Sequence, residues 1–242
     1  MSSFANFLFA AIIVLSGLNI NTAQANDTRC GTTLAPNVLA TPKNQYGEYE
    51  CQKAPIDITD QASLRRGAEI FMNQCASCHA LKYMRYERMA TDLSIPATQM
   101  KAFLQLGNAQ IHDNIHARLA PDLQLKMFGT VLPDLTLEAR KHSPDWIYTY
   151  LLSFYPDPSR PFAVNNAVLP DTAMPNVLDG LHKEVGDQAF KAQVGDLVNF
   201  LSYVSEPHQH ERKIYGIFVL LFLFIFLIPV YLLHKEYWKD MK

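Results

Sequence analysis

Hydrophobic residues recur at helical spacing in two segments that lie far apart along the chain. The first segment is predicted to begin as a helix near Thr59 or Asp60, because both residues are good N-caps. Its periodic positions are Leu64, Gly67, Ala68, Phe71 and Met72. The second segment covers residues 194–204, and Pro207 follows it as a stop signal. Its apolar stripe consists of Leu197, Phe200, Leu201 and Val204.

A glycine inside the first predicted helix indicates a close contact with another element. Gly67 lies four positions before Phe71, so the two residues share one helix face. A glycine in a helix interior costs about 1 kcal/mol relative to alanine, and its presence there favours tight packing. The segment 194–204 is the expected partner. We therefore predict a pair of crossed helices as the framework of the fold.

The middle of the chain is less regular. Residues 113–117 and 144–155 are predicted as short helices, and the second has a proline near its start. In that second helix, Trp146, Tyr150 and Phe154 follow one another at four-residue steps. Proline-rich loops come next, and residues 26–59 form a loop-rich N-terminal extension. The predicted class is all-α with long loops.

Both ends of the chain carry apolar stretches. Residues 7–18 form a short apolar run and Ala23-Gln24-Ala25 supplies a cleavage site, so residues 1–25 are predicted to be a secretory signal peptide. No Lys or Arg precedes the run, and an uncleaved signal anchor is the alternative. Residues 214–233 contain no charged side chain, and this stretch is long enough for a transmembrane helix.

The exported N-terminal part decides the orientation of the predicted span. Two cations precede the span and three come after it, so the flanking charge alone hardly favours either direction. Because a signal peptide directs the export of the adjoining chain, residues 60–211 are predicted to form a domain on the periplasmic face of the inner membrane. Residues 234–242 then form a cytoplasmic tail. Pro229 lies near the end of the span, where a lost backbone hydrogen bond is tolerable.

Charge is distributed unevenly between the two sides of the membrane. Residues 26–211 contain 16 Lys and Arg against 21 Asp and Glu, which leaves a net charge of −5. From Arg212 onward, 5 basic residues stand against 2 acidic ones. An acidic exported surface repels nucleic acid and attracts basic partners. A generic solvated acidic surface is the alternative.

Two of the 4 cysteines belong to a short motif with a specific chemistry. The segment from Cys75 to His79 reads C-x-x-C-H, the attachment sequence of c-type haem. Thiols at this spacing, here Cys75 and Cys78, form thioethers with the vinyl groups of one porphyrin, and the adjacent imidazole binds the iron. A zinc site would need a second ligand pair, and a thioredoxin-like redox pair would need a βαβ context. We therefore predict one covalently bound haem c.

The two remaining cysteines, Cys30 and Cys51, bracket most of the loop-rich extension. In an oxidising compartment they are predicted to form a disulfide. Closing a loop of this length contributes roughly 3 kcal/mol in the chain-entropy model. Free thiols or an intermolecular bond are the alternatives.

The residues alone leave the sixth ligand of the iron open. Met174 lies far downstream, in a loop rich in proline and asparagine that can deliver a thioether across the ring. Methionine more often fills a core, and Met100 or Met127 would be next in line. His112 and His116 are a further fallback. His–Met ligation raises the redox potential and suits a high-potential electron carrier.

Several linked motifs resemble the cytochrome c1 family, the membrane-anchored haem subunits of ubiquinol–cytochrome c oxidoreductase (complex III). The matching segments are APIDITDQASLRRGAEIFMNQCASCHALKYMRYERMA, LPDLTLEAR, DWIYTYLLSFYPDPSRP, AMPNVL, VNFLSYVSEPHQHERKIYG and LLHKEYWKD. The resemblance implies Met174 as sixth ligand and places Pro133 against the haem. Two positions depart from the family pattern. Leu132 replaces a second proline, and the arginine that pairs with the propionates falls at His142, which leaves Arg140 or His142 in that role.

The resemblance also implies a function in electron transfer. A Rieske iron–sulfur protein would deliver one electron to the haem, and a soluble or anchored cytochrome c would receive it. The C-terminal helix would hold the haem above cytochrome b, and the chain by itself would not be an enzyme. Two hypotheses compete with this one. The chain could be a membrane-anchored cytochrome that feeds an oxidase, or a haem peroxidase or reductase with an open axial position.

Overall fold

The computed structural model describes Cys30 and residues 51–241. The predicted signal peptide and most of the predicted extension lie outside the described residues. Helices dominate the described part, as predicted, and its short strands form two antiparallel pairs. In chain order the elements are α2 (Gln61–Ile70), η1 (Phe71–Cys75), β1 (Leu81–Arg85), α3 (Tyr86–Asp92), α4 (Ala97–Gly107), β2 (Asn114–Ile115), α5 (Pro121–Phe128), α6 (Glu138–Lys141), α7 (Pro144–Leu152), β3 (Phe154–Pro156), β4 (Val164–Asn166), α8 (Asp179–Val185), α9 (Asp187–Ser205), α10 (Gln209–Tyr237) and η2 (Lys239–Met241).

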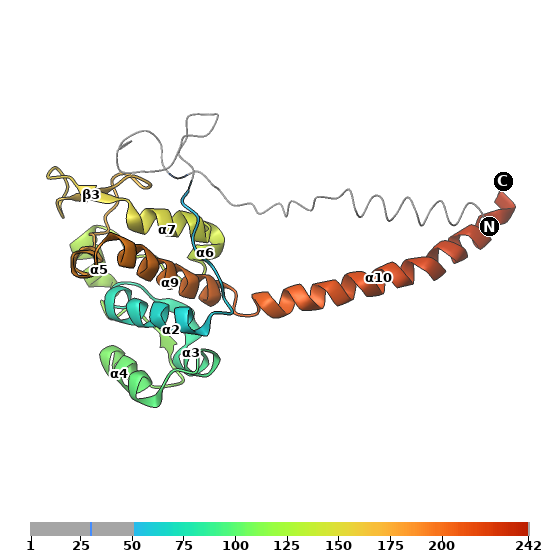
Figure 1. The fold of residues 1–242 in the computed structure, drawn as a ribbon, viewed down its shortest axis with the longest axis horizontal. Coiled ribbons are helices and arrows are strands. Elements are labelled where there is room, and N and C mark those ends of the chain that lie inside the picture. Colours follow the sequence, from blue (N-terminus) through green and yellow to red (C-terminus); the bar gives the residue numbers. More distant parts are fainter. Residues whose placement is uncertain (1–29, 31–50, 242) are drawn as a thin grey trace.

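Helices α2 and α9 lie side by side in the centre of the globular part (Figure 1). The side chain of Asp60 caps α2 by accepting hydrogen bonds from the backbone N–H groups of Ala62 and Ser63, both at 3.0 Å. The predicted start of this helix is therefore confirmed. Helix α9 is 19 residues long and begins seven residues before the predicted segment 194–204.

Gly67 is the point of close approach between α2 and α9. A Cβ atom at this position would lie 2.7 Å from the Cβ atom of Phe200 and would collide with the carbonyl oxygen of Asp196. The predicted tight packing at this glycine is thus confirmed. A bidentate contact between Arg66 and Asp196 accompanies it, with N···O distances of 2.6 and 2.9 Å.

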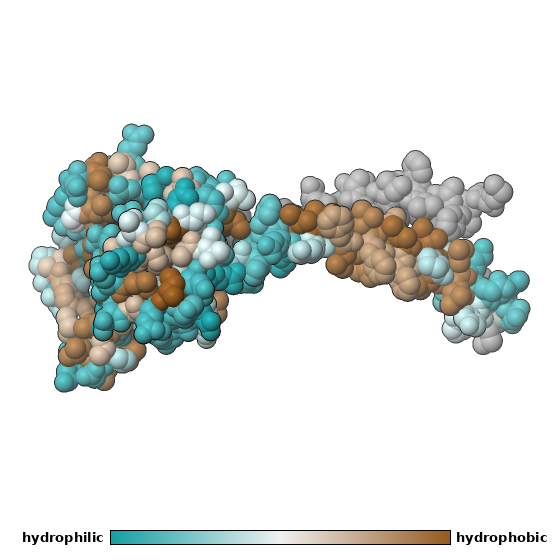
Figure 2. Space-filling view, turned by 90° about the horizontal axis from the view of Figure 1, so that it is seen from below, coloured by the Kyte–Doolittle hydropathy of each residue, from teal (hydrophilic) through white to brown (hydrophobic). Residues whose placement is uncertain are grey.

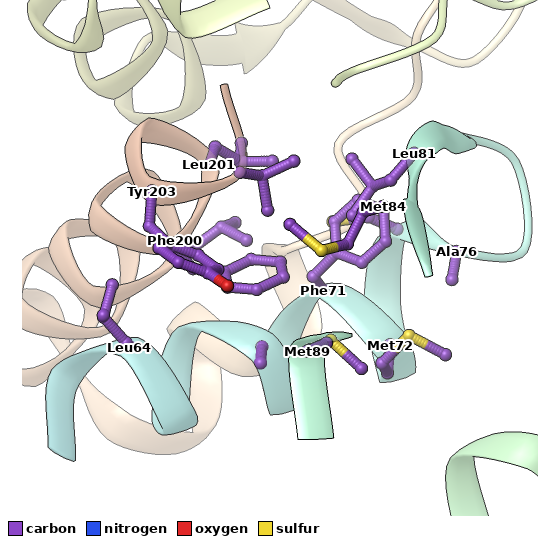
Figure 3. Packing of buried hydrophobic residues seen from close by; sticks show 14 of the residues in the cluster. Leu64, Phe71, Met72, Ala76, Leu81, Met84, Met89, Phe200, Leu201 and Tyr203 are labelled. Carbon is purple, nitrogen blue, oxygen red and sulfur yellow. The ribbon is translucent and has the colours of Figure 1, made fainter. Parts of the chain in front are cut away.

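The core of the globular part forms where the apolar stripes of the crossed helices meet. The rings of Phe71 and Phe200 are fully buried, and their centroids lie 5.9 Å apart (Figure 3). Burying a side chain of this size stabilises the fold by about 1.5–3 kcal/mol. Met72, Met84 and Met89 fill the space around these helices, in keeping with the role of methionine as core filler.

The helix predicted over residues 113–117 is wrong. This segment contains β2, which pairs antiparallel with β1 through the partners Leu81 and Ile115. The aspartate at its start closes a turn instead, because the carboxylate of Asp113 accepts a hydrogen bond from the backbone N–H of Gln110 at 2.7 Å. The carbonyl of Asp113 also accepts from the backbone N–H of Tyr86 at 3.2 Å.

The helix predicted over residues 144–155 begins as expected but ends earlier. Helix α7 starts at Pro144 after Ser143, whose side chain accepts a hydrogen bond from Trp146 N–H. The helix ends at Leu152, and Phe154–Pro156 form a strand paired with β4. A proline disfavours the α conformation in the residue before it, and Tyr155 precedes Pro156, so Tyr155 is extended.

Helix α10 projects from the globular part as a single rod (Figure 1). It is 29 residues long and apolar enough to cross a membrane by length and composition. Its surface is almost continuously hydrophobic along its middle (Figure 2). The predicted span 214–233 lies inside this helix, and Pro229 does not interrupt it. The helix also includes the first residues of the predicted tail, 234–242.

Charged residues join α10 to the globular part. The carboxylate of Glu206, between α9 and α10, pairs with Arg140 of α6 at 3.0 Å and with Arg212 of α10. The hydrogen bond from Arg212 lowers the pKa of Glu206 below its ordinary value. Close by, a guanidinium nitrogen of Arg88 lies 2.9 Å from Nε2 of His208. These contacts fix the direction in which the anchor helix leaves the domain.

Candidate haem site

The predicted attachment segment begins at the last residue of η1, which directly follows α2. Residues Phe71–Cys75 form this short π-helix, an irregularity that is frequent at functional sites. The backbone N–H groups of Cys78 and His79 both donate to the carbonyl of Cys75, at 3.0 and 2.8 Å. Cys75 and Cys78 are free thiols. Burial raises the pKa of Cys75 to about 12, so this thiol is protonated at neutral pH.

His79 is oriented by a backbone carbonyl. Its Nδ1 lies 2.9 Å from the carbonyl oxygen of Pro133, so Nδ1 carries the proton and donates it. Nε2 is left with a free lone pair, which is the form of imidazole that binds a metal. The side chain is only 9% exposed, and this burial lowers the pKa of His79. The imidazole is therefore neutral and held in one orientation.

The loop that carries Pro133 is itself fixed at both ends. The backbone N–H of Leu132 donates to Oε1 of the buried Gln124 at 2.9 Å, and that of Leu135 donates to the carbonyl of Ala80 at 2.9 Å. Leu132, which replaces a proline of the family pattern, keeps this donor because it has a backbone N–H. The carbonyl that orients His79 thus belongs to an anchored loop.

His79 and Met174 line one cavity of about 310 Å³. Cys75 and Pro133 also line it, so the structure brings together most of the residues that the sequence singled out. Leucine and isoleucine side chains from α7, α9 and the neighbouring loop make much of its wall apolar. These side chains are Leu132, Leu135, Ile147, Leu151, Leu197 and Leu201.

A ladder of aromatic rings runs from His142 through α7 to Phe154 of β3, and its first three rings line this cavity. His142 stacks on Trp146 with ring centroids 4.4 Å apart, and Trp146 stacks on Tyr150 at 5.3 Å. Phe154 meets Tyr150 edge to face at 5.2 Å. The four-residue spacing of these aromatics predicted a shared face, but it did not show that the face borders the site. Tyr150 is a site residue that the sequence did not single out.

Met174 lies in the methionine loop, residues 167–178, which connects β4 to α8. Side-chain hydrogen bonds hold this loop. Oδ1 of the fully buried Asn166 accepts hydrogen bonds from the backbone N–H groups of Val168 and Leu169, at 2.9 and 3.1 Å. Oδ1 of Asn165 accepts from the backbone N–H of Asp171 at 2.9 Å. The consecutive asparagines were visible in the sequence, but their bonding to the loop was not.

The disulfide between Cys30 and Cys51 belongs to a second apolar cluster beside the site. Its Cα atoms are 4.9 Å apart, and both cysteines are buried. They share this cluster with Tyr150, and Met174 packs against it. The disulfide therefore lies in the same apolar cluster as Tyr150, against which Met174 of the methionine loop packs.

The structure does not bring Arg140 to the cavity. Its guanidinium is paired with Glu206, whereas Lys141 and His142 line the cavity. Both of these side chains contact Glu138, at 3.3 and 3.5 Å. The choice of Arg140 as the cofactor-binding residue therefore lacks support from its position.

The fallback ligands also lie elsewhere. His112 pairs with Glu87 at 2.9 Å, and His116 borders a separate cavity beside Cys78. Met100 is buried in the core, and Met127 is 58% exposed on α5. None of these four side chains lines the cavity shared by His79 and Met174.

The residues around the cavity fit a haem attached through thioethers. Cys75, His79 and Met174 border this largely apolar space, and Cys78 joins the same three residues around a smaller adjoining pocket. Two thiols, one imidazole nitrogen and one thioether are the donor set of a His–Met haem c. Within the described residues, no group of three or more His, Cys, Asp and Glu side chains could hold a metal ion by itself. The donor set therefore suits a prosthetic group better than a bare metal ion.

A helical fold in which a C-x-x-C-H segment and a methionine border one cavity is characteristic of c-type cytochromes. The chain belongs to the cytochrome c1 family, whose family model matches residues 51–241. Membership in this family implies electron transport and a covalently bound haem.

Related proteins share most of this chain. A cytochrome c1 of Allochromatium vinosum is 44% identical over 234 residues, which cover 86% of this chain and 95% of the relative. An ammonia monooxygenase gamma subunit of Nitrosomonas europaea is 38% identical over 210 residues, 80% of this chain and 89% of that protein. A solved chain of a hyperthermophilic respiratory complex III is similar at a TM-score of 0.42 and 15% identity, with 100% of both chains covered.

Proposed function

We propose that the chain carries one haem c, attached through Cys75 and Cys78 and ligated by His79 and Met174. The observation that carries this proposal is the convergence of His79 and Met174, from distant parts of the chain, on one cavity. When bound, the haem iron alternates between two oxidation states and so takes up and releases one electron.

The residues around the cavity have separable tasks. The carbonyl of Pro133 holds the proton of His79 on Nδ1 and presents Nε2 to the cavity. The thioether of Met174 borders the same cavity, and the leucines of α7 and α9 exclude water from it. With both His79 and Met174 as ligands, a bound haem would have no position free for a substrate, which favours electron transfer over the peroxidase or reductase hypothesis.

The propionate groups of this haem are proposed to meet Lys141 and His142. Both side chains line the cavity, and both are potential hydrogen-bond donors. Arg140 is the weaker choice, because it does not line the cavity and its guanidinium is paired with Glu206 outside it. Lys141 lies beside the position that the family resemblance gave to the propionate-binding arginine.

The electron-transfer partners are inferred from the family. We propose that the chain is a subunit of a quinol–cytochrome c oxidoreductase, with α10 packed against cytochrome b in the inner membrane. The haem domain would face the periplasm, accept one electron from a Rieske iron–sulfur protein and pass it to a cytochrome c. The net charge of −5 on residues 26–211 supports a basic cytochrome as acceptor.

A second candidate assembly comes from the Nitrosomonas relative, whose name places it in an ammonia monooxygenase. The chain would then serve a membrane-bound monooxygenase with the same haem site. The higher identity to the Allochromatium cytochrome c1 favours the oxidoreductase.

Purification of the full-length, affinity-tagged chain from its own membranes tests both candidates. We expect a di-haem cytochrome b and a Rieske protein to co-purify with it. Monooxygenase subunits in their place would favour the second assembly. A stain for covalently bound haem after denaturing electrophoresis should mark the chain and should fail for a Cys75→Ser, Cys78→Ser variant. A native chain without bound haem would overturn the proposal.

A further inference from the structure

Tyr150, Thr172 and Met174 form a closed circuit of hydrogen bonds at one end of the cavity. The backbone N–H of Met174 lies 3.4 Å from Oγ1 of Thr172, which lies 3.0 Å from the hydroxyl oxygen of Tyr150. The Tyr150 hydroxyl lies 3.4 Å from Sδ of Met174, which closes the circuit. Since the tyrosine hydroxyl has a single proton, it donates to the sulfur and accepts from Thr172.

The tyrosine in this circuit is held by residues outside the methionine loop. Its ring is 8% exposed and lies between Trp146 and Phe154 in the aromatic ladder. Its backbone carbonyl accepts a hydrogen bond from Nδ2 of Asn166 at 2.7 Å. The hydroxyl is therefore a fixed donor that helix α7 presents to the loop. A methionine side chain has three rotatable bonds and no orientation of its own, so such a donor restricts it.

We propose that Tyr150 and Thr172 are positioning residues that aim the thioether of Met174 and tune it as a ligand. This inference rests on the proposed function, in which Met174 is the axial ligand. A thioether ligand favours the reduced state of haem iron, so a hydrogen bond that holds the sulfur in place would keep the redox potential high. Removal of the hydroxyl lowers the redox potential and lets other ligands replace the sulfur more easily.

The purified, haem-loaded full chain in detergent is suitable for the test. Tyr150→Phe removes the hydroxyl and keeps the ring. Thr172→Val removes the intermediate link, and Thr172→Ser restores it. Tyr148→Phe is the matched control, because Tyr148 lies on the same helix and its hydroxyl donates to the carbonyl of Lys191 at 3.3 Å instead. Two quantities are measured: the midpoint potential, and the imidazole concentration that abolishes the sulfur-to-iron absorption band.

Tyr150→Phe is expected to lower the potential and to reduce the imidazole concentration required by about fivefold, the factor that corresponds to one net hydrogen bond. Thr172→Val should shift both quantities in the same direction by less. Thr172→Ser and Tyr148→Phe should match the wild type. A role in packing alone would not move the potential and would not be rescued by Thr172→Ser.

A Met174→Leu variant separates failure of this inference from failure of the ligand proposal. If Met174→Leu loses the band while Tyr150→Phe behaves like Tyr148→Phe, the hydrogen-bond circuit has no tuning role and the inference is overturned alone. If Met174→Leu keeps the band, Met174 is not the ligand and both fall. If Tyr150→Phe does not fold, the contrast between Thr172→Val and Thr172→Ser decides in the same way.

Discussion

The helix pair α2–α9, of which α9 lines the cavity, and the methionine loop are held in place by different interactions. The helix pair is stabilised by buried apolar side chains and by regular backbone hydrogen bonds. The methionine loop is held by the side chains of Asn165, Asn166 and Tyr150. The position of His79 therefore depends on packing that many residues share, whereas the position of Met174 depends on a few specific contacts.

Because of this difference, the stability of the fold and the ligation of the iron by Met174 should respond to substitutions in different regions. A substitution in the helix pair should lower the free energy of unfolding, while molecules that remain folded keep their His–Met site. A substitution in the methionine loop should change the site at a smaller cost in stability. Three substitutions in the haem-loaded full chain in detergent test this contrast.

Phe200→Ala should have the largest effect. The ring is fully buried against Phe71, so its removal leaves a cavity between α2 and α9 and costs about 4 kcal/mol of unfolding free energy. Denaturant unfolding followed by circular dichroism measures the loss. Phe162→Ala, at a ring that is 40% exposed, is the control and should lose under about 1 kcal/mol. Loss of the sulfur-to-iron band in folded Phe200→Ala would contradict the contrast.

Gly67→Ala should have the second-largest effect on stability. The added methyl group collides with a backbone oxygen, which cannot move without the helix, so we expect a loss of about 3 kcal/mol. Gly180→Ala is the matched control, because no atom lies within 4 Å of a Cβ at that position of α8. The control should be neutral or slightly stabilising, since alanine is the better helix former. Equal unfolding midpoints for the two variants would refute the close crossing of the helices.

Asn166→Leu tests the loop. The substitution leaves two backbone N–H groups without their acceptor and the Tyr150 carbonyl without its donor, at a cost of about 2 kcal/mol. Because the loop carries Met174, the sulfur-to-iron band should weaken even at temperatures where the protein is fully folded. An intact band with reduced stability would mean that Met174 is held by other contacts.

The sequence predicted the helix pair better than the loop for a physical reason. Local signals predict both the helix and the face on which it packs. These signals are the apolar periodicity, the Asp60 cap and Gly67. The helix expected over residues 113–117 failed because the turn made by Asp113 and its pairing with β1 depend on contacts distant in sequence.

The same limit applies to the site. The spacing of Cys75, Cys78 and His79 is a chemical requirement that can be read directly from the sequence. Met174 could be proposed from its loop and from family resemblance. The pairing of Arg140 with Glu206 and the hydrogen bond from Tyr150 to Met174 could not be predicted from the sequence. Side-chain contacts between distant segments produce no periodic pattern along the chain.

Glu206→Gln should have the smallest effect and should depend on pH. The pKa of Glu206 is lowered by Arg212, so the ionised carboxylate stabilises the folded state above its ordinary pKa of 4.5, and that contribution is lost as the pH falls through the lowered value. The variant should be less stable than wild type by under about 1 kcal/mol at pH 7, and the two should converge as the pH falls from 4.5 through the lowered pKa of Glu206. A stability difference that persists at low pH would assign the effect to packing.

Carbon monoxide binding to the reduced, haem-loaded chain tests most directly the claim that His79 and Met174 close the site between them. Carbon monoxide needs an open axial position on ferrous iron. The account predicts an unchanged spectrum for the wild type under carbon monoxide and a shifted spectrum for Met174→Leu. A wild-type spectrum that shifts as readily as that of Met174→Leu would show an open site and would contradict the account.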